Sequence, residues 1–289
     1  MRKLIGIVLI AVLCVVMSAG CSTDYEYATY LTSTSTSMDV KLSVDPIWTQ
    51  EIPEAPEEYT IEFQGSTYTG TYRLSTDAYL CSFASHQYWG DTCSFRVRAN
   101  TGELVSFSFL VSGFSKQEVV KQDVPDPEKT AYEIAEQTAS EYIDTSKYTR
   151  SISSDVTHAE VGGKTLEYTT YSVIYTKEIG GISTDDTLHV YVTSKGTLKG
   201  VFFGEIGAFD HIRQTDISLK KVEDSVADKL LELEQKAGKN LSDDYEIEEH
   251  TIHLTPNKEV AVVSLVNVWW ETPDGDASRD LLQMTTLLQ

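Results

Sequence analysis

Short runs in which apolar and polar residues alternate are the feature that most constrains the fold of this chain. Alternation over residues 59–63 resumes over residues 68–72 after Gly65-Ser66. A period of two is typical of strands that bury one face, and a short glycine turn between two such runs predicts a β-hairpin. A second hairpin is expected over residues 95–109. Residues 41–120 are therefore expected to form a β-rich module without a strong helix.

Two later segments change to the three- and four-residue spacing of a helix. The first is expected to begin near Pro127, because Asp126 can cap a helix and proline suits its first position. The second is expected to run from about Leu219 to Lys236, with Gly238 ending it. Alternating segments follow each helix. The strands expected there cover residues 152–161, 166–177, 188–193, 198–203, 245–254, 259–270 and 278–288.

A helix followed by three or four antiparallel strands thus occurs twice. This order predicts the α+β class, with repeated helix-on-antiparallel-sheet modules behind a mainly β N-terminal part. Residues 21–40 are rich in Ser and Thr and predict a flexible tether, although their tyrosines could instead let part of them pair as a strand. The expected parts are a leader (1–20), the tether (21–40), the β-rich module (41–120) and two α+β modules (121–214 and 215–289).

Two segments with a strand–glycine–strand pattern carry a family resemblance. They are VRANTGELVSFSF at Val97–Phe109 and VYVTSKGTLKGVFF at Val190–Phe203, and both resemble the ends of PepSY or cystatin-like modules. Over residues 41–289 the chain also resembles uncharacterised lipoproteins of Gram-positive bacteria that carry such modules. The resemblance implies one helix across a curled sheet, and a role in inhibiting or regulating extracellular peptidases. The first module departs from this pattern, because no helix is expected before Tyr59.

The N-terminus has the layout of an export signal. Arg2 and Lys3 precede an apolar run from Leu4 to Met17, and small residues then lead to Cys21. The run is shorter than the roughly 20 residues of a membrane span. It resembles a bacterial lipoprotein signal, which implies lipidation of Cys21 and attachment to the outer face of the cell membrane. That family prefers leucine where this chain has Ser18, so cleavage without lipid is the alternative.

The formal net charge of −21 limits the kinds of partner that this chain can bind. Nucleic-acid binding needs basic residues that neutralise phosphates, and the sequence has no basic run. We therefore expect no nucleic-acid partner. The same acidity opposes an electrostatic hold on anionic lipid, which leaves the N-terminal lipid as the expected membrane anchor. An envelope protein or peptide is the other expected partner.

The cysteines outside the leader predict a disulfide. Cys21 is the expected lipidation site, which leaves Cys81 and Cys93 as an even pair in an oxidising compartment. The alternative is a catalytic thiol at Cys81 with His86 as its base. Such a site also needs a group that orients the base.

The usual catalytic motifs, including G-x-S-x-G, H-E-x-x-H and phosphate-binding loops, do not occur in the sequence. Ser218 and Lys221 match the S-x-x-K pattern of penicillin-recognising enzymes, but Ser218 also suits a helix cap and the companion motifs are missing. His250 and His253 would point to opposite faces of a strand. We therefore expect neither a metal nor a cofactor.

Two further groups of residues near the C-terminus are candidate binding sites. Asp274, Asp276 and Asp280 surround a glycine turn, and a solvated turn is favoured over a calcium loop because calcium needs more oxygen ligands. Trp269 and Trp270 are adjacent on an expected strand, so one faces the core and the other could stack on a sugar or a peptide. These two tryptophans are the candidate ligand-binding residues.

These features together predict a non-enzymatic cell-surface lipoprotein that binds a protein or peptide. The alternatives are a lipoprotein that binds a glycan or another small ligand, and an envelope hydrolase with a dispersed site.

Overall fold

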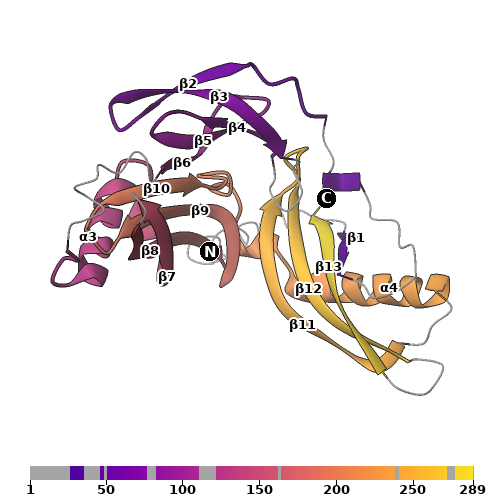
Figure 1. The fold of residues 1–289 in the computed structure, drawn as a ribbon. Coiled ribbons are helices and arrows are strands. Elements are labelled where there is room, and N and C mark those ends of the chain that lie inside the picture. The colour runs from indigo at the N-terminus through magenta and orange to yellow at the C-terminus, as the bar shows by residue number, and fades with distance from the viewer. Residues whose placement is uncertain are drawn as a thin grey trace, which may run out of the picture.

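The computed structural model describes residues 27–35, 46–48, 51–76, 83–110, 122–161, 164–237, 241–271 and 277–288. Within these ranges, thirteen strands form one mixed sheet accompanied by two α-helices (Figure 1). The strands are β1 (Tyr27–Ser35), β2 (Glu58–Phe63), β3 (Ser66–Thr76), β4 (Ser85–Trp89), β5 (Cys93–Arg98), β6 (Leu104–Phe109), β7 (Thr149–Val161), β8 (Lys164–Ile179), β9 (Ile182–Thr193), β10 (Leu198–Phe203), β11 (Leu241–Leu254), β12 (Val260–Glu271) and β13 (Ala277–Leu288). The helices are α3 (Pro127–Ala139) and α4 (Leu219–Ala237), with short 3₁₀ turns η1 (Pro46–Trp48), η3 (Thr145–Lys147) and η4 (Gln214–Asp216).

The strand order is β1-β13-β12-β11-β9-β10-β6-β5-β4-β3-β2, and β7 and β8 join it through β9. Strands β2 to β10 form one group, over which α3 packs against β8 and β9. An aromatic-rich core fills this group; in it Phe63 stacks on Phe107 with ring centroids 4.3 Å apart. The same core contains Ile61 from β2 and Val201 from β10, so it includes residues on both sides of position 120.

The second group contains β1, β11, β12 and β13, with α4 packed on it. The apolar face of α4 explains this packing, because Val226, Leu230 and Leu233 recur at helical spacing and are buried. They contact a core that includes Trp270 of β12 and Leu31 of β1.

The two groups of strands are joined by a short parallel ladder. Thr251 of β11 pairs with Ser183 of β9, and Ile252 pairs with Thr184. Figure 1 shows β11, β12 and β13 turning away from the group that carries α3. A separate apolar cluster that includes Phe209 lies between these elements.

The expected fold class of repeated helix-on-antiparallel-sheet modules is wrong. A single mixed sheet of thirteen strands runs through the described residues instead. The repetition exists along the sequence, but pairing between distant strands overrides it: β10 pairs with β6, β11 pairs with β9, and β1 completes the last group of strands beside β13. A sheet edge accepts any strand with a suitable register, so sequence order did not determine these neighbours.

The flexible tether expected over residues 21–40 is also wrong for Tyr27–Ser35. These residues form β1, which is the alternative that the tyrosines allowed, and Leu31 anchors the strand at 2% exposure. Residues 85–89 form β4, a strand that the sequence pattern did not predict.

Both predicted helices and their first residues are confirmed, whereas Gly238, the glycine predicted to stop the second helix, lies outside the described residues. Asp126 caps α3 by accepting a hydrogen bond from the backbone N–H of Lys129 at 3.2 Å, and Pro127 is the first helical residue. Helix α4 begins at Leu219 as predicted and ends at Ala237, one residue beyond the predicted end. The structure also contains all of the strands predicted after the two helices. β9 begins six residues before the predicted Leu188 and β11 begins four residues before the predicted Tyr245, whereas the other ends shift by at most three residues.

Candidate functional site

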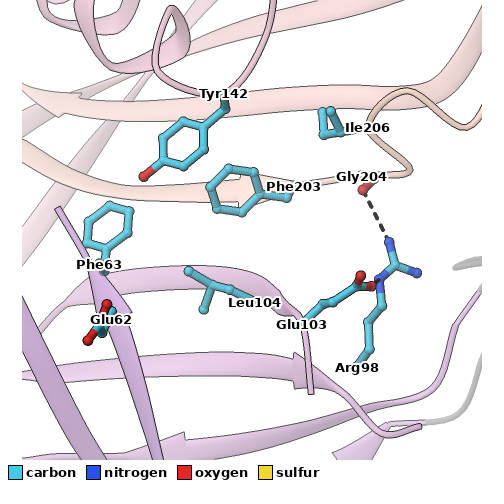
Figure 2. A pocket seen from close by; sticks show the side chains of 9 residues that line it. All are labelled: Glu62, Phe63, Arg98, Glu103, Leu104, Tyr142, Phe203, Gly204 and Ile206. Carbon is cyan, nitrogen blue, oxygen red and sulfur yellow. Dashed lines mark hydrogen bonds and ion pairs between the residues drawn. The ribbon is translucent and has the colours of Figure 1, made fainter. Parts of the chain in front are cut away.

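A cleft of about 380 Å³ opens between the β5–β6 hairpin and the end of β10. Figure 2 shows side chains from both sides of this space facing one another. Its lining residues are Glu62, Phe63, Arg98, Glu103, Leu104, Tyr142, Phe203, Gly204 and Ile206.

One wall of the cleft is apolar and aromatic. Tyr142, which follows α3, meets Phe203 of β10 edge to face, with ring centroids 4.8 Å apart. Phe63 of β2 and Leu104 of β6 face them across the cleft (Figure 2). Tyr142 is 38% exposed, and burial of the rest of the side chain, followed by the nearby Glu141 charge, raises the pKa of its hydroxyl. This wall can take up an aliphatic or aromatic side chain.

The other end of the cleft holds a buried ion pair. Arg98 Nη1 donates to Glu205 Oε1 at 2.9 Å, and the two side chains are 10% and 6% exposed. Arg98 also donates to the Gly204 carbonyl at 3.4 Å and lies 3.2 Å from Glu103 (Figure 2). The Phe83 ring lies 3.9 Å from the guanidinium carbon. These contacts hold the end of β5 against the segment that follows β10.

A tight turn places the acidic rim of the cleft. Gly102 has a φ of +74°, a conformation that glycine adopts without strain, and it directs Glu103 and Leu104 back towards the cleft. Glu62 at the end of β2 adds a second exposed carboxylate. The cleft therefore combines an apolar wall with carboxylates at its rim, and this arrangement suits an apolar side chain that has a cation beside it.

The structure leaves the expected lipidation and disulfide untested. Cys21 and Cys81 lie outside the described residues. Cys93, on β5, is 2% exposed and forms no disulfide with any residue that the structure describes. Burial raises the pKa of its thiol, and a hydrogen bond from the Gly90 backbone partly opposes this shift.

His86, the alternative catalytic base, is a buried residue of β4. Its Nδ1 lies 2.8 Å from the Ser75 hydroxyl, and its side chain is 2% exposed. Burial lowers the pKa of the imidazole, so the neutral form is favoured. A Cys81–His86 pair cannot be placed, because Cys81 is not among the described residues.

The adjacent tryptophans occupy different environments. Trp270 is 1% exposed in the core beside α4, where no ligand can stack on it. Trp269 is half-buried, and the Arg279 guanidinium lies 5.9 Å from its ring centroid. Neither residue lines the cleft. Trp89 of β4, at 46% exposure, presents more of its surface than either.

The remaining candidates make structural contacts. The Ser218 hydroxyl accepts a hydrogen bond from the Lys221 backbone at 3.4 Å, as a helix cap does. His250 and His253 engage different neighbours: His250 Nδ1 lies 2.9 Å from the Ser264 hydroxyl, and His253 Nδ1 lies 3.4 Å from Asp185.

The acidic turn is only partly described. Asp274 and Asp276 lie outside the described residues, whereas Asp280 is buried on β13. No group of three or more His, Cys, Asp or Glu side chains within the described ranges could hold a metal ion.

No sequence pattern predicts the residues that form the cleft. Arg98 and Glu103 lie inside the segment that carries the family resemblance, where the pattern indicates only a strand and a turn. A charged residue that ends an apolar strand was the available signal at Arg98. Its partner Glu205 is 107 positions away, and no local pattern connects the two.

The comparisons with known proteins identify no relative. No family model, no curated protein and no solved structure matches this chain. None of the helices in the described part of the chain is long and apolar enough to cross a membrane.

Proposed function

We propose that this protein is a non-catalytic lipoprotein, anchored to the outer face of the cell membrane through Cys21, that binds a protein or peptide. The cleft between the β5–β6 hairpin and β10 carries the binding part of this proposal. Its volume of about 380 Å³ accommodates one large side chain together with neighbouring backbone. The N-terminal export signal supports the proposed location, because it resembles the signals of bacterial lipoproteins.

The chemistry of the cleft indicates which peptides to try. Tyr142, Phe203 and Leu104 offer an apolar surface. Glu62 favours a cation beside it, since Glu103 already pairs with Arg98. A peptide with phenylalanine or leucine next to lysine meets both requirements. The ion pair between Arg98 and Glu205 keeps the two sides of the cleft in place before binding, which reduces the entropy lost on binding.

Binding is tested with fluorescein-labelled peptides that contain Phe-Lys or Leu-Lys, followed by fluorescence anisotropy. Tyr142→Ala removes part of the apolar wall and should weaken binding about tenfold, as loss of an aromatic contact at an interface centre does. Tyr245→Ala is the matched control, because Tyr245 on β11 is 39% exposed, against 38% for Tyr142, and does not line the cleft. Equal effects of the two substitutions, or no binding by any peptide, would contradict the proposal. A thermal midpoint raised by cell-wall sugars and not by peptides would favour the glycan-binding alternative.

The location is tested separately. Cys21→Ser removes the expected lipid-bearing thiol and should move the protein from the membrane fraction to the medium, with loss of label from a metabolically supplied fatty-acid analogue. A protein that carries no lipid label before substitution would contradict the anchor and favour simple secretion.

A further inference from the structure

An exposed backbone edge runs along β7. This strand has 13 residues and pairs with β8 throughout, from Thr149 opposite Thr176 to Val161 opposite Lys164, without a register shift. No other described strand pairs with β7. Uncovered edges of this kind bind extended segments of other chains, because their N–H and C=O groups lack strand partners.

The register identifies the residues that present these groups. The Ser194 backbone N–H donates to the Thr169 carbonyl, so odd-numbered residues of β8 face β9 and even-numbered residues face β7. Each even-numbered residue of β8 pairs with an odd-numbered residue of β7. The even-numbered residues of β7, including Ser154, therefore direct their backbone groups away from the sheet.

A groove of about 420 Å³ lies beside this edge, between β7 and α3. Helix α3 packs on β8 and β9, which leaves the side of β7 that faces α3 partly uncovered. The Arg150 guanidinium lies over the Tyr132 ring at 4.5 Å and 3.5 Å from Glu136. Arg150 and Ile152 share one face of β7, and Ile152 packs against the core. A strand added beside β7 would therefore direct alternate side chains into this groove.

Charge indicates the kind of partner. Helix α3 contributes Glu133 and Glu136 to the groove. Glu136 already pairs with Arg150, whereas Glu133 is 67% exposed. Its neighbour Lys129, 3.8 Å away, is 71% exposed, so Glu133 is the carboxylate that a basic side chain can reach. The whole chain carries a net charge of −21, so pairing of β7 with a second copy would bring two strongly acidic molecules together. Val156, 49% exposed on the same face as Arg150, adds an apolar contact further along the strand.

We infer that the outer edge of β7 binds an extended segment of a cationic partner protein by strand addition, with a basic side chain in the groove beside α3. Backbone hydrogen bonds supply the affinity, and the exposed carboxylate of Glu133 selects the charge. This site shares no lining residue with the cleft and does not depend on it.

The probe is a labelled peptide of about ten residues, enough to pair with most of β7, that alternates valine and threonine around one central lysine. A second peptide carries glutamate in place of the lysine. Anisotropy should show at least about tenfold tighter binding of the lysine peptide to the intact protein. Equal binding of the two peptides, or no binding of either, would overturn the inference.

Two substitutions test the edge and the groove separately. Ser154→Pro removes one outward backbone N–H at a position where an edge strand tolerates proline, and it should weaken lysine-peptide binding about tenfold. Glu133→Lys alters only an exposed side chain and should reverse the preference between the two peptides, even if the proline variant fails to fold. Glu246→Lys makes the same charge change at an exposed position on β11 and should leave the preference unchanged.

The remaining outcomes are also decisive. Tyr142→Ala should leave lysine-peptide binding unchanged, so failure of the cleft proposal and failure of this one are distinguishable. An unchanged affinity in a folded Ser154→Pro variant would overturn strand addition. A dimer of the intact protein in sedimentation that Ser154→Pro dissolves would replace the cationic partner by a second copy.

Discussion

Replacing Arg98 with methionine should destabilise this protein more than any substitution of an exposed charge. Methionine preserves most of the apolar stem but removes the cation from Glu205, whose side chain is only 6% exposed. Loss of one partner of a buried ion pair typically costs about 3–5 kcal/mol, because the other charge stays buried. Lys258, 3.6 Å from Glu205 and 59% exposed, offsets part of this cost. The exposed ion pair with Glu103 adds little, so we expect a loss of about 3 kcal/mol.

Urea unfolding followed by far-UV circular dichroism measures the effect of this substitution. A loss of about 3 kcal/mol lowers the midpoint by about 1.5 M if the m-value is about 2 kcal/mol/M. Glu205→Gln alone should also destabilise, and the double variant should lose less than the sum of the two single losses, since neither charge is then left alone. Lys258→Met is the control and should cost less than about 1 kcal/mol. A loss below about 1 kcal/mol for Arg98→Met, or strictly additive losses in the double variant, would refute this reasoning.

Three further predictions concern stability. Leu230→Ala should lower the unfolding free energy by about 2–5 kcal/mol, because it creates a cavity under α4. Leu231→Ala, at a neighbouring position that is 53% exposed, should change it by less than about 0.5 kcal/mol, and similar losses for the two variants would contradict the packing of α4. Asp126→Ala should cost about 1 kcal/mol through loss of the α3 cap, and a thermal midpoint equal to that of the unsubstituted protein would argue against the cap. Acid should destabilise the protein between pH 7.5 and 5.5, because burial lowers the pKa of three histidines in the folded state. The stability that these neutral histidines contribute is fully present above about pH 6.5 and is lost as pH falls. The loss is up to about 1.4 kcal/mol per pH unit for each proton taken up on unfolding. These histidines are His86, His189 and His250. At lower pH, Asp185 and Asp186 have the opposite effect, since burial raises their pKa and protonation then removes the cost of burying a charged carboxylate. Urea midpoints that do not change from about pH 7.5 to 5.5 would contradict the histidine effect.

The local elements of this protein could be predicted from the sequence because short-range interactions specify them. Asp126 and Pro127 mark the start of α3, and the apolar spacing of α4 identifies the face that it buries. The hairpins follow from period-two alternation and glycine turns, as at Gly102 with its φ of +74°. Each of these signals lies within a few residues of the element that it predicts.

The neighbours of these elements, and the two candidate binding surfaces, were decided only by the tertiary structure. The segment that forms β1 is rich in Ser and Thr, yet it becomes a strand because it pairs with the edge of β13 and buries Leu31 in the core. Arg98 and Glu205 come together because β10 pairs with β6, the strand after the one that carries Arg98. Backbone hydrogen bonds are nearly the same for every residue, so a sequence pattern reveals where a strand forms but not which distant strand will pair with it.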